Sequence, residues 1–322
     1  MEPLTLPENL AEPAQVPADP LLTPAATRHA FTKVGLGLSA CLLGGSLLLV
    51  LVLSFLPEDL HQDVLILLNA LCVDVGGKLL AMLFLHRLPD APMEKKSLPV
   101  KEILALCAMA YGLMLLGNYL GTGLMLLMNP QGENPLNSVV TLENLSLLTV
   151  LDLVVFAPVL EEMLFRKLLL KKIARWGEIP AMVFSALAFS LFHGNFYQFF
   201  YAFMLGLLLA HVYLSTGKLL YPILIHAFVN TLGSVVPLGL MAAEAHLSPH
   251  AAEGLEILLS LALLGLGILG FVLLVRRQKT AKFFPCPEKG LTRWMYLNAG
   301  SIFFLLLCLV LMAASTFGLS VH

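Results

Sequence analysis

Residues 34–56 read VGLGLSACLLGGSLLLVLVLSFL, a run of 23 residues without a single Asp, Glu, Lys or Arg. A helix rises about 1.5 Å per residue, so about 20 apolar residues are enough to cross the hydrocarbon core of a bilayer. Comparable runs recur along the chain, and residues 255–275 contain one charged side chain, Glu256. The run at 34–56 is therefore the first of several expected membrane-spanning helices.

The composition excludes two broad classes of protein. Of the 322 residues, 58% are apolar and 12% are charged, whereas soluble domains are about 45–50% apolar and about 25% charged. So few charges cannot cover a globular surface in water, which excludes a soluble enzyme. The 19 Lys and Arg residues nearly balance the 21 Asp and Glu residues, so no excess of positive charge favours nucleic acid as a partner.

We expect an all-α polytopic membrane protein, a bundle of about nine transmembrane helices around a buried polar cavity. The expected helices span residues 34–56, 64–85, 103–128, 139–172, 179–193, 198–215, 219–238, 255–275 and 294–319. The fourth is too long for one crossing and contains Pro158, which predicts a kink or an interfacial lead-in. The fifth and sixth are short, so eight crossings remain an alternative if one of them is re-entrant.

The positive charges lie in alternate connections between these helices. Of the 19 Lys and Arg residues, 17 fall near helix ends that share one side of the membrane when nine helices are threaded through it. The intervening loops, 57–63, 129–138, 194–197 and 239–254, contain none. By the positive-inside rule we expect a multi-pass protein of the cell (plasma) membrane with a cytoplasmic N-terminus.

The remaining two cations lie within apolar segments. Lys78 follows Asp74 by four residues, close enough for an ion pair on one helix face. Packing of the bundle is the simpler interpretation of this pair, and a place in a substrate path is the alternative. The other cation, Arg166, ends the stretch APVLEEMLFR that begins at Ala157.

Three ionisable residues crowd this stretch. Each costs roughly 2.5–3.5 kcal/mol near the bilayer centre on insertion scales. Glu162 and Arg166 are four residues apart, so we expect them to form an ion pair. Glu161 is rotated about 100° from Glu162, and we expect its carboxylate to point elsewhere, into a wet cavity. The alternative is that all three are structural.

Further polar groups lie on two other helices. His193 ends the fifth expected helix, and His226 and Asn230 share one face of the seventh. Measured from the cytoplasmic helix ends, Glu161 and His193 lie roughly 21 Å deep, and His226 and Asn230 roughly 12 and 18 Å. The four side chains can meet in one layer if their three helices are neighbours.

Such a cluster can perform a limited chemistry. A carboxylate in a cavity of low dielectric can take a proton from water as general base while His193 holds that water. His226 and Asn230 can donate hydrogen bonds to an oxyanion on a carbonyl. Together these steps hydrolyse an amide bond. Alternatively, Glu161 or Glu162 could hold a divalent metal such as zinc with the two histidines.

Three motifs in order resemble the type II CAAX-prenyl endopeptidase and bacteriocin-processing family, also called CPBP or Abi. These motifs are Glu161-Glu162-xxx-Arg166, Phe189-xxx-His193 and His226-xxx-Asn230. Thr216-Gly217, with Leu219 after it, is also similar to the family. The resemblance covers about residues 145–240.

The resemblance implies an intramembrane endopeptidase with Glu161 as the catalytic base and His193 assisting it. His226 and Asn230 would form the oxyanion hole, with Glu162, Arg166 and Phe189 in supporting places. Members of the family are also commonly labelled metalloproteases. We favour the mechanism without a cofactor; a metal-dependent one would use Glu162, His193 and His226 as ligands.

The resemblance and the apolar pattern together divide the chain into four parts. We expect a disordered Pro-rich cytoplasmic tail at 1–30, N-terminal transmembrane helices at 31–135, CPBP-like catalytic-core helices at 136–240 and C-terminal transmembrane helices at 241–322.

Three functions fit these expectations. The first is a protease that cleaves a membrane-associated protein or peptide of CAAX or bacteriocin-leader type near the cytoplasmic face, with the lipid bilayer as its surroundings. The second is a non-catalytic scaffold or bacteriocin self-immunity protein that uses the same cavity for binding. The third is a transporter in which Asp74, Lys78 and Glu161 form a relay. We favour the protease.

Overall fold

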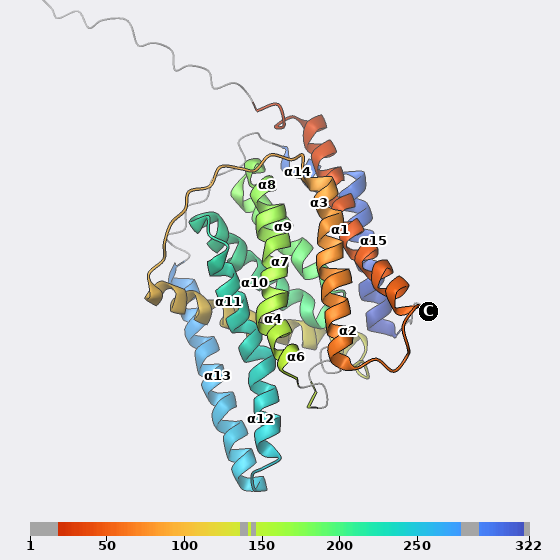
Figure 1. The fold of residues 1–322 in the computed structure, drawn as a ribbon. Helices are drawn as coiled ribbons and strands as arrows, with labels where there is room; N and C mark the ends of the chain where they lie inside the picture. The colour runs from red at the N-terminus through yellow and green to blue at the C-terminus, as the bar shows by residue number, and fades with distance from the viewer. Residues whose placement is uncertain (1–18, 136–140, 143–145, 278–289, 319–322) are drawn as a thin grey trace, which may run out of the picture.

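The computed structural model describes residues 19–135, 141–142, 146–277 and 290–318 (Figure 1). Within these ranges the regular structure is helical. The uninterrupted long helices are α1 (Pro24–Leu53), α4 (Val100–Met128), α9 (Glu178–Phe192), α10 (Phe196–Thr216), α13 (Pro249–Arg277) and α15 (Ala299–Phe317). A short helix, α14 (Thr292–Tyr296), precedes α15.

Three further segments change helix type along their length. The first contains α2 (Gln62–Asn69), the π-helical η1 (Ala70–Gly76) and α3 (Gly77–Leu85). The second contains α6 (Leu147–Leu151), π-helical η2 (Asp152–Phe156), α7 (Ala157–Glu162), π-helical η3 (Met163–Leu170), α8 (Lys171–Ile173) and the 3₁₀ turn η4 (Ala174–Trp176). The third contains α11 (Leu220–Asn230), π-helical η5 (Thr231–Val235) and α12 (Val236–Glu244).

Helix lengths and compositions confirm the expected fold class, an all-α polytopic membrane protein. Among the described residues, 7 helices are long and apolar enough to cross a membrane by length and composition. Two other expected crossings do not reach that length or composition. Helix α9 has 15 residues, and the segment from α6 to α8 carries the charged residues of the EE-xxx-R motif. The count of nine therefore stays a prediction.

Two expected boundaries differ from the structure. Helix α1 begins at Pro24, inside the stretch expected to be a disordered tail, because Thr23 accepts a hydrogen bond from the Ala26 N–H and Pro24 suits a first helical position. Residues 1–18 of that tail lie outside the described residues. The fourth helix, expected at 139–172, begins at Leu147, where the Ser146 side chain accepts from the Thr149 N–H.

Contacts near the helix ends bring several of the described cations to one end of the bundle, here called the cationic end. Arg175 binds Asp19 at 2.9 Å, Lys218 binds Ser97 at 2.7 Å, and Arg28 lies over the Trp294 ring. At the other end, Asn129 donates to the Thr316 carbonyl and Ser146 to Asp63. The described connections at that end contain no Lys or Arg.

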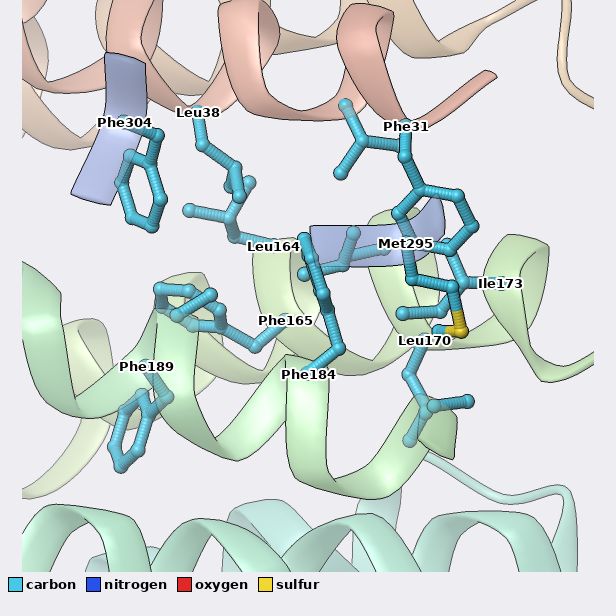
Figure 2. Packing of buried hydrophobic residues seen from close by; sticks show 14 of the residues in the cluster. Phe31, Leu38, Leu164, Phe165, Leu170, Ile173, Phe184, Phe189, Met295 and Phe304 are labelled. Carbon is cyan, nitrogen blue, oxygen red and sulfur yellow. The ribbon is translucent and has the colours of Figure 1, made fainter. Parts of the chain in front are cut away.

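The apolar core encloses the segment that carries the EE-xxx-R motif. Phe165 of η3, Phe189 of α9 and Phe31 of α1 are each at most 1% exposed. Figure 2 shows side chains of α1, η3, α9 and α15 filling the space between these helices. A second buried cluster joins α4, α10 and α11. The motif segment is therefore held on several sides by packed apolar side chains.

A close contact between helices explains Gly270 of α13. A Cβ atom on Gly270 would overlap the carbonyl oxygen of Ala108 on α4, whereas one on Gly265 would meet nothing within 4 Å. Small residues let membrane helices approach in this way, where lipid offers no hydrophobic force between them. The Gly265–Gly270 stretch thus packs α13 against α4 through Gly270.

We predict that Gly270→Ala lowers the thermal stability of the purified protein, by the equivalent of about 1–3 kcal/mol for an overpacked contact. Gly265→Ala, on the same helix, should leave the melting temperature unchanged or slightly raised, since Ala favours helix over Gly. Melting curves in one detergent compare the two. Equal losses in both variants would contradict the packing described.

A strap formed by residues 86–99 crosses the cationic end between α3 and α4. The Ala91 N–H donates to the Lys171 carbonyl, and the Lys96 N–H donates to the Thr216 carbonyl, each at 2.8 Å. Asp90 accepts from the ammonium groups of Lys171 and Lys172 at 2.7 and 3.0 Å. Burial alone would raise the pKa of the Asp90 carboxyl, but the two lysines outweigh it and lower that pKa below its ordinary 3.8.

This depressed pKa predicts a pH-dependent contribution to stability. The ionised Asp90 carboxylate makes its full contribution to the free energy of unfolding above about pH 5. This contribution is lost as pH falls through the lowered pKa. Wild type should therefore melt above Asp90→Asn at neutral pH, with the difference shrinking below pH 4 or so. Glu94→Gln is the control, because the exposed Glu94–Lys96 pair should contribute little. A difference that grows on acidification would contradict the assignment.

Candidate functional site

The three helices that carry the motif residues are neighbours. Segment η3 packs against α9, and α7 packs against α11 and η1. This adjacency is the condition under which the four side chains of Glu161, His193, His226 and Asn230 were expected to share one layer. The structure meets that condition.

The Glu162–Arg166 ion pair expected from the i,i+4 spacing is confirmed. Arg166 Nε lies 2.8 Å from Glu162 Oε2, and Arg166 Nη2 lies 3.4 Å from Glu162 Oε1. Both side chains are 0% exposed. A buried charge needs a partner and further hydrogen bonds to offset its desolvation. Glu162 and Arg166 each provide the other with an oppositely charged, hydrogen-bonded partner.

Arg166 is held from the neighbouring helix α9 as well. Its Nη1 donates to Ser185 Oγ at 3.0 Å, and Ser185 Oγ donates to the Phe165 carbonyl at 3.0 Å. The guanidinium carbon lies 5.2 Å from the centre of the Phe189 ring, a distance suited to a cation–π contact. Sequence reasoning missed Ser185, because a serine in an apolar helix does not reveal its partner on another helix.

His226 joins the two glutamates. Its Nδ1 lies 3.1 Å from Glu162 Oε1, and its Nε2 lies 3.7 Å from Glu161 Oε2. A carboxylate held ionised by arginine only accepts hydrogen bonds, so the Nδ1 hydrogen is assigned as the donor to Glu162. This bond fixes the ring, which leaves Nε2 facing Glu161.

His193 is oriented by its own helix. Its Nδ1 lies 2.9 Å from the Phe189 carbonyl, which can only accept, so Nδ1 is the donor and Nε2 of the neutral ring is an acceptor. The chain then turns at Gly194, whose φ of 65° favours glycine. Asn195 caps α10 and donates to the His193 carbonyl at 2.8 Å. The local backbone thus sets the position of the imidazole.

Glu161 and His193 line a cavity of about 270 Å³. The Glu161 side chain is 28% exposed, whereas Glu162 is fully buried. Two adjacent carboxylates therefore lie in different surroundings, one open to the cavity and one sealed in an ion pair, as the 100° rotation between them predicts.

Asn230 has a different neighbour from the one expected. Its Nδ2 donates to the Leu153 carbonyl at 2.9 Å, and Asn230 is not among the residues that line the cavity. In the π-helical turn η2 the Ala157 N–H bonds to the Asp152 carbonyl, so the next donor to Leu153 would be residue 158. That residue is proline and has no N–H. Asn230 therefore supplies the hydrogen bond that Pro158 cannot.

A comparison with known protein families finds one match. Residues 143–232 match the family model described as Rce1-like: Type II CAAX prenyl endopeptidase Rce1-like. The resemblance predicted from the three motifs is confirmed. The matched region contains all three motifs. No curated protein and no solved structure matches the chain.

Two further polar residues of the cavity were missed by the sequence analysis. Asp152 and Asn69 line the same cavity as Glu161. In a regular α-helix, the nine residues from Asp152 to Glu161 make about 2.5 turns and place the two side chains on opposite faces. The π-helical turn η2 changes that register and turns Asp152 toward the cavity. The available signal was an acidic residue inside a membrane segment, which is rarely without function.

The alternative metal ligands expected from the sequence do not gather into one site. Both oxygens of Glu162 already accept from Arg166, and one also accepts from His226. Among the residues that the structure describes, no group of three or more His, Cys, Asp or Glu side chains could hold a metal ion. Glu162, His193 and His226 are thus a poor fit to the expected ligand set, and we route no chemical step through a metal.

We predict that Arg166→Ala strongly destabilises the protein, because it leaves Glu162 buried without its cation. Loss of one partner of a buried pair costs about 3–5 kcal/mol, and the measurement is the folded yield and melting temperature in detergent. Lys167→Ala is the matched control, since Lys167 is adjacent and exposed.

The double variant Glu162→Leu/Arg166→Met removes both charges and should recover part of the lost stability. An Arg166→Ala protein that melts like wild type would contradict the structural role of the pair.

Proposed function

We propose that this chain is an intramembrane endopeptidase that hydrolyses a peptide bond in a membrane-associated protein or peptide. The observation that carries the proposal is the contrast between the two glutamates. Glu162 is sealed by Arg166, whereas Glu161 faces the cavity and contacts His226. The family match of residues 143–232 supports the same class of reaction.

In the proposed mechanism Glu161 is the general base. It takes a proton from a water molecule while the water oxygen forms a bond to the scissile carbonyl carbon, whose oxygen becomes an oxyanion. When this intermediate collapses, the C–N bond breaks and the proton held by Glu161 passes to the leaving nitrogen. The products are a carboxyl group and an amine, so atoms and charges balance.

His193 is the proposed partner of the attacking water. Its Nδ1 hydrogen is engaged by the Phe189 carbonyl, so neutral Nε2 offers a lone pair to a water proton. Together with the Glu161 carboxylate, this lone pair orients the water by accepting both of its hydrogens. Orientation of this kind lowers the barrier without any charge on the imidazole.

His226 and Asn230 are the proposed donors to the oxyanion. Since the Nδ1 hydrogen of His226 is given to Glu162, His226 can donate only through Nε2 of the protonated ring. Asn230 uses one N–H for Leu153, and the second N–H of its amide is the one proposed to reach the oxyanion.

We also propose the orientation and the substrate class. The positive-inside rule favours a cytoplasmic location for the cationic end, and therefore for the N-terminus, in a plasma membrane. The description of the matched family, a CAAX prenyl endopeptidase, favours a prenylated C-terminal peptide as substrate. A bacteriocin leader peptide is the competing substrate in the test below.

The test uses the purified full-length chain in liposomes with three quenched fluorescent peptides: a farnesylated CAAX peptide, its unmodified counterpart and a double-glycine leader peptide. We expect the farnesylated peptide to be cleaved. Glu161→Gln and His193→Ala should each lower kcat by about 10²-fold or more, with melting temperatures near wild type.

Glu256→Gln is the control, because Glu256 is exposed on α13 away from the cavity. Full activity of Glu161→Gln would contradict the proposed base. Loss of cleavage with a chelator and its restoration by zinc would contradict the metal-free mechanism, and no cleavage of any peptide by wild type would favour a scaffold.

A further inference from the structure

One side of the cavity comes from a part of the chain outside the family match. Asn69, Asp74 and Lys78, on the segment α2–η1–α3, line the same cavity as Glu161 and His193, whereas the match begins at residue 143. We call these three residues the polar wall. The proposed chemistry uses none of them.

The π-helical turn η1 brings the polar wall together. In a regular α-helix, the five residues from Asn69 to Asp74 would turn the second side chain about 140° away from the first. The i→i+5 hydrogen bonds of a π-helix place residues five apart above one another. Asn69, Asp74 and, one α-helical turn further, Lys78 therefore share the face that borders the cavity. Such turns are frequent at functional sites.

The ion pair in this wall is only partly enclosed. Lys78 Nζ lies 2.6 Å from Asp74 Oδ1, and the side chains are 15% and 24% exposed. One contact uses one of the three ammonium N–H groups and one of the two carboxylate oxygens. The sealed Glu162–Arg166 pair, by contrast, is 0% exposed. The open pair can therefore accept and donate further hydrogen bonds toward the cavity.

A peptide that is cleaved within a membrane needs hydrogen-bonding partners for its backbone. Its scissile bond has to be extended, and an extended backbone cannot satisfy its own N–H and C=O groups as a helix does. Apolar rings line much of the cavity, including Phe165, Phe189 and Phe192, and offer no hydrogen bonds. The proposed catalytic side chains contact the scissile carbonyl, so the neighbouring peptide groups need other hydrogen-bonding partners.

We propose that Asn69, Asp74 and Lys78 bind the extended backbone of the substrate beside the scissile bond. Asp74 accepts a hydrogen bond from a substrate N–H, Lys78 donates one to a substrate carbonyl oxygen, and the Asn69 amide does either. The inference rests on the proposed endopeptidase function and adds a peptide-binding wall to it. In this role the three are positioning residues that hold the peptide against Glu161.

The first test separates binding from turnover. In the Glu161→Gln background, the Kd of a fluorescent farnesylated CAAX peptide is measured in nanodiscs, so the result does not depend on cleavage. The double variant Asp74→Asn/Lys78→Met removes both charges together and leaves neither stranded. We expect it to raise Kd at least tenfold, and in the active protein to raise KM similarly with kcat changed less than threefold.

Lys218→Met is the matched control, because Lys218 bonds Ser97 at the cationic end outside the cavity. Asn69→Ala, which removes an amide without any change of charge, provides a milder variant and should raise Kd about threefold or more. A lowered melting temperature with Kd and KM at wild-type values would overturn the proposal and leave the pair a packing role. If the polar-wall variants raise Kd but wild type cleaves no peptide, the peptide-binding role of the wall stands and the endopeptidase function is contradicted.

The second test works on the unaltered protein. Peptides methylated at one backbone nitrogen at a time lose one N–H each, and we expect one or two of these peptides to bind wild type at least fivefold more weakly. One of these peptides lacks the N–H that donates to Asp74. For that peptide, Asp74→Asn should cause no further loss of binding affinity. If the effects of methylation and of Asp74→Asn on Kd multiply for every methylated peptide, the assignment of Asp74 to the substrate backbone is overturned.

Discussion

The buried ion pair between Glu162 and Arg166 is the constraint on which the rest of the site depends. Charges are scarce in this chain, and this pair lies at 0% exposure among apolar side chains. Because Arg166 is bound to Ser185 of α9 and Glu162 to His226 of α11, the pair ties three helices together. It also fixes the imidazole of His226, whose other nitrogen faces Glu161. One electrostatic contact thus holds α9 and α11 against the segment that carries Glu161.

Departures from regular helix supply several of the polar groups that line the cavity. The π-helical turns η1 and η2 rotate Asn69, Asp74 and Asp152 toward the space that Glu161 and His193 border. Each such turn alters backbone hydrogen bonding, which a membrane environment penalises. At Pro158 the missing hydrogen bond is replaced by the Asn230 side chain. Asn230, which the sequence analysis expected as an oxyanion donor, therefore also stabilises the irregular helix that carries Glu161.

Contacts between residues four apart on one helical segment could be predicted from the sequence. The pairs Glu162–Arg166 and Asp74–Lys78 follow from i,i+4 spacing alone. Asp152 could not be placed, because a π-helical turn depends on packing and shifts the register by an amount that composition does not reveal. Ser185 and Asn230 bond to groups on other helices, so their partners emerge only when the helices are assembled.

The central claim is that Glu161 faces water while the neighbouring ion pair is sealed. The most direct measurement is thiol reactivity in a cysteine-free background, with a small cationic methanethiosulfonate reagent added from water. Glu161→Cys, which leaves the ion pair intact, should react readily, whereas Ser185→Cys, at a buried position against Arg166, should stay unmodified in the folded protein. An unreactive Glu161→Cys, or equal reactivity at both positions, would contradict the account.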